Sequence, residues 1–190
     1  MKEDDGPADL VVNSLTVVDS LNGGYIKTIS KEGKNTVMIG NHPSGSGSVI
    51  TYNKEGSPSV RIGSNVGDGG YMNIRMNSGK NAIYVGTNEN GNSVFISKNS
   101  KGDPAFVAGD NNDGHGYLKT VIGSGKNSVL IGSKKDGSGY VTTFVSSGKR
   151  TSLISSDKSG TGVMGLYDKD QKLQWSQKGQ NPVSESSDDK

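Results

Sequence analysis

Residues 25–40 read YIKTISKEGKNTVMIG, and most of the chain repeats this stretch at a fixed interval of 23 residues. The interval is clearest at the glycine of KEGK, Gly33. Its equivalents in the later copies are Gly56, Gly79, Gly102, Gly125 and Gly148, with Gln171 in the last copy. Because seven copies stay in step without an insertion or deletion, the sequence predicts a repeat protein.

Two more glycine columns keep the same interval. One closes the VMIG run and contains Gly40, Gly63, Gly86, Gly109 and Gly132, with Ser155 in the sixth copy. The other precedes the first apolar run and contains Gly24, Gly47, Gly70, Gly116, Gly139 and Gly162, with Ser93 as the exception. Glycines at fixed offsets indicate turns or close backbone contacts that recur in every copy.

The composition limits what the repeats can build. The 190 residues include 29 glycines, and only 29% are hydrophobic, which is lean for a thick globular core. Repeat proteins can fold on such a composition, because each unit buries a thin strip against its neighbours. The 21 basic and 19 acidic residues nearly balance, which argues against nucleic acid as a partner.

Other sequence features bear on the compartment. The chain has no cysteine, which excludes disulfides and thiolate metal sites. No apolar run approaches the roughly 20 residues of a membrane span, and the first residues, MKEDDGPADL, lack the apolar core of a signal peptide. We expect an extracellular or surface-exposed protein whose leader or anchor has been removed, and the cytoplasm stays open as an alternative.

Each copy contains two short runs rich in Val, Ile, Thr and Tyr, separated by a polar turn and followed by a Gly, Asn, Asp and Ser loop. Such runs are too short for helices and are typical of strands. We therefore predict an all-β domain over residues 10–178, with a degenerate half-repeat at 10–21 and then seven two-strand repeats, or about fourteen strands. Residues 1–9 and 179–190 are polar and are predicted to be a disordered lead-in and tail.

Side chains alternate between the two faces of a strand, so apolar columns identify the predicted core. Two columns lie on the first strand of the copies: Ile26, Val49, Met72, Phe95, Leu118, Val141 and Met164, and then Thr28, Thr51, Ile74, Ser97, Thr120, Thr143 and Leu166. Two lie on the second strand: Val37, Val60, Ile83, Phe106, Val129, Ser152 and Trp175, and then Ile39, Ile62, Val85, Ala108, Ile131, Ile154 and Gln177.

The phase of these columns is the basis for choosing an architecture. A hairpin at KEGK with Ser30 opposite Lys34 would place Ile26 opposite Met38, which puts the two sets of columns on opposite faces. Strands that belong to two different sheets allow both sets to point inward. The sequence therefore favours a two-sheet β-solenoid with coils about 4.8 Å apart. Stacked hairpins in a single layer and a trimeric β-fibre with a shared core are the alternatives.

Three stretches carry a resemblance to known proteins: NKEGSPSVRIG at 53–63, NSGKNAIYVG at 77–86 and GSGKNSVLIG at 123–132. The pattern resembles Gly-rich β-repeat arrays of bacterial surface and secreted proteins and, more loosely, phage tail-fibre shafts. It extends over about residues 24–177. The resemblance implies a non-enzymatic structural module, an elongated spacer or fibre on a cell or virion surface that associates with itself.

Four tyrosines occupy one position of their repeats and are the candidate ligand-binding residues: Tyr25, Tyr71, Tyr117 and Tyr140. We expect them to face outward, where a row of aromatic rings can stack on sugars. The alternative is that they shield the sheet or contact another subunit. Carbohydrate binding is the second hypothesis for the function, after the structural one.

Lysines follow the turn glycine in five copies: Lys34, Lys80, Lys126, Lys149 and Lys172. Such a ridge can hold a polyanion, but Ser57 and Asp103 interrupt it. Lysines at sheet edges more often discourage edge-to-edge association, which is the interpretation we favour.

The remaining chemical candidates are weaker. The loop DNNDG at 110–114 has the oxygen ligands that calcium prefers, but the other copies lack its carboxylates, which favours a polar turn. His42 and His115 are expected to be exposed loop histidines, and no metal or cofactor is predicted. No copy stands out with the paired carboxylates of a glycosidase, so we predict no enzyme. The third hypothesis is an ice-binding solenoid using the column of Thr28, Thr51, Thr120 and Thr143, although these threonines are predicted to point inward.

Overall fold

The structure is a computed structural model that describes residues 16, 24–41, 46–64, 69–157 and 159–179. The predicted lead-in at 1–9, the half-repeat at 10–21 apart from Thr16, and the tail apart from Gly179 lie outside the described residues. His42 lies outside them as well.

The described residues form fourteen antiparallel strands in one sheet, in which every strand pairs with its neighbours in sequence. The strands are β1 (Tyr25–Ile29), β2 (Asn35–Asn41), β3 (Gly47–Tyr52), β4 (Pro58–Ser64), β5 (Gly70–Arg75), β6 (Asn81–Thr87), β7 (Ser93–Lys98), β8 (Pro104–Asp110), β9 (Gly116–Val121), β10 (Asn127–Ser133), β11 (Gly139–Phe144), β12 (Arg150–Ser156), β13 (Gly162–Tyr167) and β14 (Leu173–Lys178). The predicted all-β repeat with two strands per copy is confirmed.

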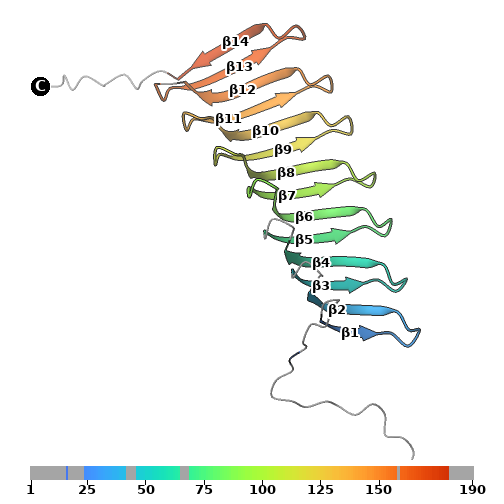
Figure 1. Cartoon of the computed structure of the whole chain (residues 1–190). Helices are drawn as coiled ribbons and strands as arrows, with labels where there is room; N and C mark the ends of the chain where they lie inside the picture. The colour runs from blue at the N-terminus through green and yellow to red at the C-terminus, as the bar shows by residue number, and fades with distance from the viewer. Residues whose placement is uncertain (1–15, 17–23, 42–45, 65–68, 158, 180–190) are drawn as a thin grey trace, which may run out of the picture.

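The sheet is a single open layer (Figure 1). Successive hairpins stack from β1 at one end to β14 at the other, and the turns after odd-numbered strands line one long edge. The turns after even-numbered strands line the opposite edge. Among the described residues there is no helix of the length and apolarity that a membrane crossing requires.

The KEGK turn forms as the sequence predicts. The Ser30 amide donates to the Lys34 carbonyl at 2.8 Å, and the Gly33 amide donates to the Ser30 carbonyl at 2.9 Å. Gly33 has a φ of 76°, a left-handed conformation that glycine adopts without a steric penalty. A type I turn closed by a left-handed glycine is a standard three-residue hairpin loop, and it recurs at each described turn glycine of this column.

The register contains a feature that the sequence analysis did not anticipate. Ile26 pairs with Ile39 and Thr28 pairs with Val37, but Ile29 pairs with Asn35, so Thr36 is an extra residue in β2. This β-bulge recurs in every hairpin that follows an odd-numbered strand. One extra residue reverses the face on which all later side chains of the strand lie.

The favoured two-sheet solenoid is therefore wrong, and the structure has the single-layer arrangement of stacked hairpins that was the first alternative. The phase argument failed because it assumed that Ile26 faces Met38. Ser30 does lie opposite Lys34, but the bulge at Thr36 then returns Val37 and Ile39 to the face of Ile26.

All four apolar columns consequently lie on one face of the sheet, which we call the apolar face. The columns were predicted to form a buried core, and this prediction is wrong for the chain by itself. Ile39 is 48% exposed and Ile62 is 49% exposed. Ten of the fourteen exposed large hydrophobic residues belong to these columns, because a single layer has no second sheet to cover them.

The opposite face is covered by its own side chains. Ile50 is 3% exposed and Thr142 is 2% exposed, and both lie in the middle of their strands on this face. Met38 lies directly opposite Ile50, and the Tyr52 hydroxyl reaches the Met38 sulfur at 3.9 Å. The long side chains of neighbouring strands thus shelter the centre of this face, while the apolar face stays open.

Candidate functional site

The four candidate tyrosines all lie on the face opposite the apolar face, which we call the tyrosine face. Their register places Tyr25 opposite Gly40, Tyr71 opposite Gly86, and Tyr117 and Tyr140 on either side of Gly132. Tyr25 is exposed, and the other three are half-buried. The structure therefore brings the four residues to one surface.

The tyrosines explain the glycine column that closes the VMIG run. A Cβ atom at Gly86 would lie 2.7 Å from the Gly70 carbonyl oxygen and 2.8 Å from the Tyr71 Cβ. A Cβ at Gly40 would meet Gly24 and Tyr25 in the same way. Glycine is needed at these positions because the neighbouring strand approaches too closely for a side chain.

The row of tyrosines is interrupted. Ser48, Val94 and Val163 occupy the equivalent position on β3, β7 and β13. Tyr71 stacks on Tyr84 of the next strand, with ring centroids 6.1 Å apart and planes inclined by 15°. The surface is therefore a set of aromatic patches, of which the Tyr71–Tyr84 pair is the most regular.

Lysines partly cover two of these rings. The Lys119 Nζ lies 5.6 Å from the centroid of Tyr117, and the Lys27 Nζ lies 5.7 Å from that of Tyr25. An ammonium group at this distance is attracted to the face of the ring. Such contacts add positive charge beside the aromatic patches.

The lysine ridge has a role that the sequence analysis missed. Each bonded lysine donates through Nζ to a carbonyl in the turn of the next hairpin along the same edge. The bonds are Lys34 to Lys54 at 3.1 Å, Lys80 to Lys101 at 2.7 Å, Lys126 to Ser147 at 2.7 Å and Lys149 to Lys169 at 2.6 Å. The lysines thus tie successive turns together, which accounts for their position after the turn glycine.

The stem of the lysine also packs on the next turn. A Cβ at Gly102 or Gly148 would lie 3.1 Å from the Cδ of Lys80 or Lys126. In the last copy Gln171 replaces the glycine at a φ of 66°, and its side-chain amide bonds the Arg150 backbone amide at 2.9 Å and carbonyl at 3.0 Å. These bonds offset the strain of a left-handed conformation at a non-glycine residue.

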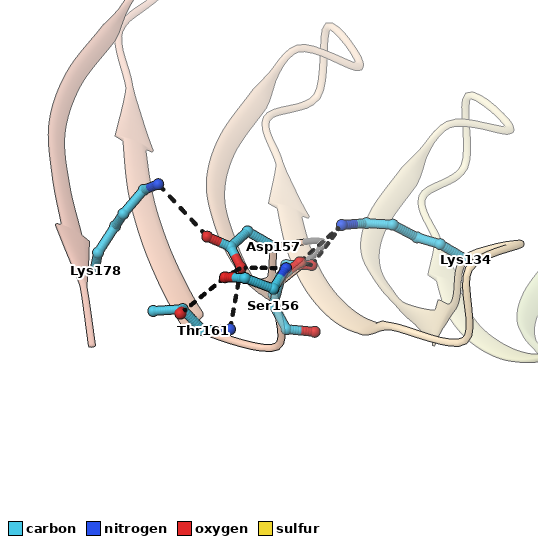
Figure 2. Close-up of polar contacts among 7 residues, drawn as sticks. Lys134, Ser156, Asp157, Thr161 and Lys178 are labelled. Carbon is cyan, nitrogen blue, oxygen red and sulfur yellow. Dashed lines mark hydrogen bonds and ion pairs between the residues drawn. The ribbon is translucent and has the colours of Figure 1, made fainter. Parts of the chain in front are cut away.

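A second polar network lies on the opposite edge, at the end of the sheet that includes β14 (Figure 2). The Lys134 Nζ donates to the Ser155 hydroxyl at 2.7 Å, and the Lys178 Nζ lies 3.5 Å from the Asp157 Oδ2. Figure 2 shows the two lysines approaching Ser156 and Asp157 from opposite sides.

Asp157 is held by its own turn as well. Its Oδ1 accepts a 2.6 Å bond from the Ser159 hydroxyl and a 3.0 Å bond from the Thr161 amide. The Ser159 hydroxyl is the main reason that the pKa of Asp157 lies below its ordinary value of 3.8, since it stabilises the ionised carboxylate. Ser138 lowers the pKa of Asp136 in the same way.

Hydroxyl pairs mark four of the bulges on the apolar face. The pairs are Thr28 with Thr36 at 2.6 Å, Thr51 with Ser59 at 2.9 Å, Thr120 with Ser128 at 2.7 Å and Thr143 with Thr151 at 2.7 Å. The threonines of the ice-binding hypothesis thus lie on the open face, and the prediction that they point into a closed interior is wrong. Where the first member is Ile74, the partner is Ala82, so the two positions change together between copies.

The candidate calcium loop is an internally bonded turn. The Asn111 Oδ1 accepts 3.0 Å bonds from the amides of Asp113 and His115. The Asn112 Oδ1 accepts a 2.6 Å bond from the Asn92 side chain of the preceding loop on the same edge. Within the described ranges, no three His, Cys, Asp or Glu side chains come together in a way suited to a metal ion.

A hollow near the C-terminal end of the sheet was not anticipated from the sequence. It lies beside the turn between β11 and β12 and is lined by Val145, Lys149, Arg150, Tyr167 and Asp168, among others. The Arg150 guanidinium lies 5.6 Å from the Tyr167 ring centroid. The two ends of the hollow come from neighbouring copies, which is why one copy alone gives no signal for it.

No family model matches the sequence, and no curated protein matches it. A search of solved structures finds, among others, a porin-like protein from Bacteroides uniformis that is 14% identical. The alignment covers 77% of this chain and 58% of that protein, with a TM-score of 0.22.

Proposed function

We propose that this chain is a non-enzymatic structural module, an elongated spacer or fibre segment at a cell or virion surface. One observation carries the proposal: each strand pairs only with its neighbours in sequence, so every added copy extends the sheet along a single axis. Thirteen steps of about 4.8 Å between fourteen strands give a length of roughly 62 Å.

The spacer proposal makes the length of the particle proportional to the number of copies. Deletion of residues 93–115, which removes β7, β8 and one complete interval, should shorten the particle by about 10 Å and leave it folded. The maximum dimension from small-angle X-ray scattering measures the change. Deletion of residues 70–92 is the matched control, because removal of a different copy must shorten the particle equally. A compact particle whose dimension ignores copy number would contradict the proposal.

A second candidate function, carbohydrate binding, is favoured by one observation. The tyrosines lie on the face opposite the apolar face, so they stay accessible when that face is covered. Replacing Tyr71 and Tyr117 with alanine should then abolish glycan-array binding while circular dichroism stays unchanged. Tyr52→Ala is the control, since that hydroxyl contacts Met38. An array on which the native protein gives no signal would dismiss this candidate.

A further inference from the structure

The apolar face has the dimensions of a protein–protein interface. It contributes two residues per strand over fourteen strands, a strip about 62 Å long and about 14 Å wide. The resulting area of roughly 900 Å² is close to the 800 Å² that each partner contributes to a standard stable interface. A sheet with one apolar face must pack that face against another layer to form a core. The strip therefore supplies enough surface for a stable complex.

The surroundings of the strip match the anatomy of an interface. Along one side, the strand ends carry polar residues such as Asn41, Ser64 and Asp110. Along the other side, hydroxyl pairs such as Thr120 with Ser128 satisfy each other. An apolar centre with a polar rim is the usual composition of a protein–protein interface.

The spacing of the strip identifies the partner. Its side chains recur every two strands, or about 9.6 Å, over the whole length of the sheet. Matching large and small side chains along 62 Å requires a partner with the same spacing, and a second copy of this chain has it. From the dimensions and the spacing together, we infer that copies of this chain pack on one another through their apolar faces. This inference rests on the proposed structural function and names the partner for it.

Phe95 and Phe106 are the best place to test the inference. They meet edge to face at the middle of the strip, with ring centroids 5.8 Å apart. They lie on β7 and β8, the two central strands of the sheet. The pair therefore lies near its own counterpart whether the copies run parallel or antiparallel.

The first experiment measures mass in solution for charge substitutions. Ile131→Lys places an ammonium group on the strip, where the residue is 41% exposed, and should weaken assembly by about 100-fold because the charge would be buried without a partner. Val145→Lys is the matched control: Val145 is 44% exposed but lies in a turn, away from the strip. Sedimentation velocity over a concentration series should show dimers or larger assemblies for the native chain and the control.

A second measurement covers the case in which Ile131→Lys fails to fold. The chain has no cysteine, so a single Phe95→Cys substitution gives one reactive site per chain. A short bismaleimide should link copies through position 95 in native buffer and not in denaturant, while Val145→Cys should stay unlinked. Native protein with the mass of one chain and no cross-link at position 95 would overturn the inference. So would an Ile131→Lys variant that assembles like the native chain, or monomers that bind to vesicles of neutral phospholipid.

The outcomes separate this inference from the spacer proposal. A monomeric particle about 62 Å long would refute self-association and keep the spacer. An oligomer whose dimensions ignore copy number would refute the spacer and keep self-association.

Discussion

At the scale of single residues, two columns that look alike in the sequence have different physical causes. The turn glycines, such as Gly125, adopt a left-handed backbone with open space around the missing side chain. The glycines that close the second strand, such as Gly86, leave no room for a side chain because the backbone of β5 lies against them. The sequence shows both columns as invariant spacing, and only the packing of neighbouring strands separates the two causes.

Gly86→Ala should therefore destabilise the protein by about 1–3 kcal/mol, because the added methyl group would meet the Gly70 carbonyl and the Tyr71 Cβ. Urea denaturation followed by circular dichroism gives the free energy of unfolding. Gly47→Ala is the matched control, since its Cβ would have nothing within 4 Å and its backbone is not left-handed. Equal losses for the two substitutions would refute the packing argument.

The lysines after the turn could be seen in the sequence, but their bonds could not. The partner carbonyls lie about one interval away, and their distance from Nζ depends on how the hairpins stack. Lys126→Met keeps the stem and removes the 2.7 Å bond to Ser147, so it should cost about 0.5–1 kcal/mol in the same unfolding assay. Lys172→Met should cost less, because within the described part of the chain no further hairpin follows β14. A larger loss at Lys172 would contradict this role.

At the scale of the element, the strand positions and the four apolar columns were predictable from spacing, but the bulge was not. A bulge changes neither the length of a copy nor the composition of a strand, so the glycine columns contain no trace of it. The one available signal was the joint change of positions eight residues apart, such as Thr120 with Ser128 and Ile74 with Ala82. That signal shows that the residues touch, and contact across the turn requires the extra residue.

The hydroxyl pair should behave as a coupled unit. Thr120→Val leaves the Ser128 hydroxyl without its 2.7 Å partner and should cost about 1 kcal/mol. Adding Ser128→Ala to this variant should recover most of that loss, because Ile74 with Ala82 is already an apolar version of the pair. A double-mutant cycle from thermal denaturation measures the coupling, and strictly additive losses would show that the pair does not interact.

At the scale of the whole molecule, the all-β repeat was predictable, and the number of layers was not. Choosing between one sheet and two depended on the phase of Ile26 relative to Val37, and a single extra residue decided it. The candidate tyrosines were correctly assigned to one surface, because parity within a single column does not depend on the bulge. The open apolar face could not be foreseen, since the sequence shows which residues are apolar and not what covers them.

Contacts between sequence neighbours alone predict unequal stability along the sheet. Every residue of β1 and β14 is exposed, because each of these strands has one paired edge within the described sheet. Hydrogen exchange followed by mass spectrometry should show the fastest amide exchange in β1 and β14 and the slowest near β7 and β8. Uniform protection from end to end would instead indicate that the sheet opens as one cooperative unit.

The order of the strands also determines how the chain responds to a pull on its two ends. With β1 and β14 at opposite ends of the stack, tension loads the backbone hydrogen bonds a few at a time, as in opening a zipper, instead of shearing them together. Each hairpin should yield in turn at low force. Residues 25–178 would lengthen from about 62 Å to roughly 500 Å before the chain is taut. A tether made of this sheet would absorb mechanical load by gradual extension, and the pairing of adjacent strands would restore it when the load is released.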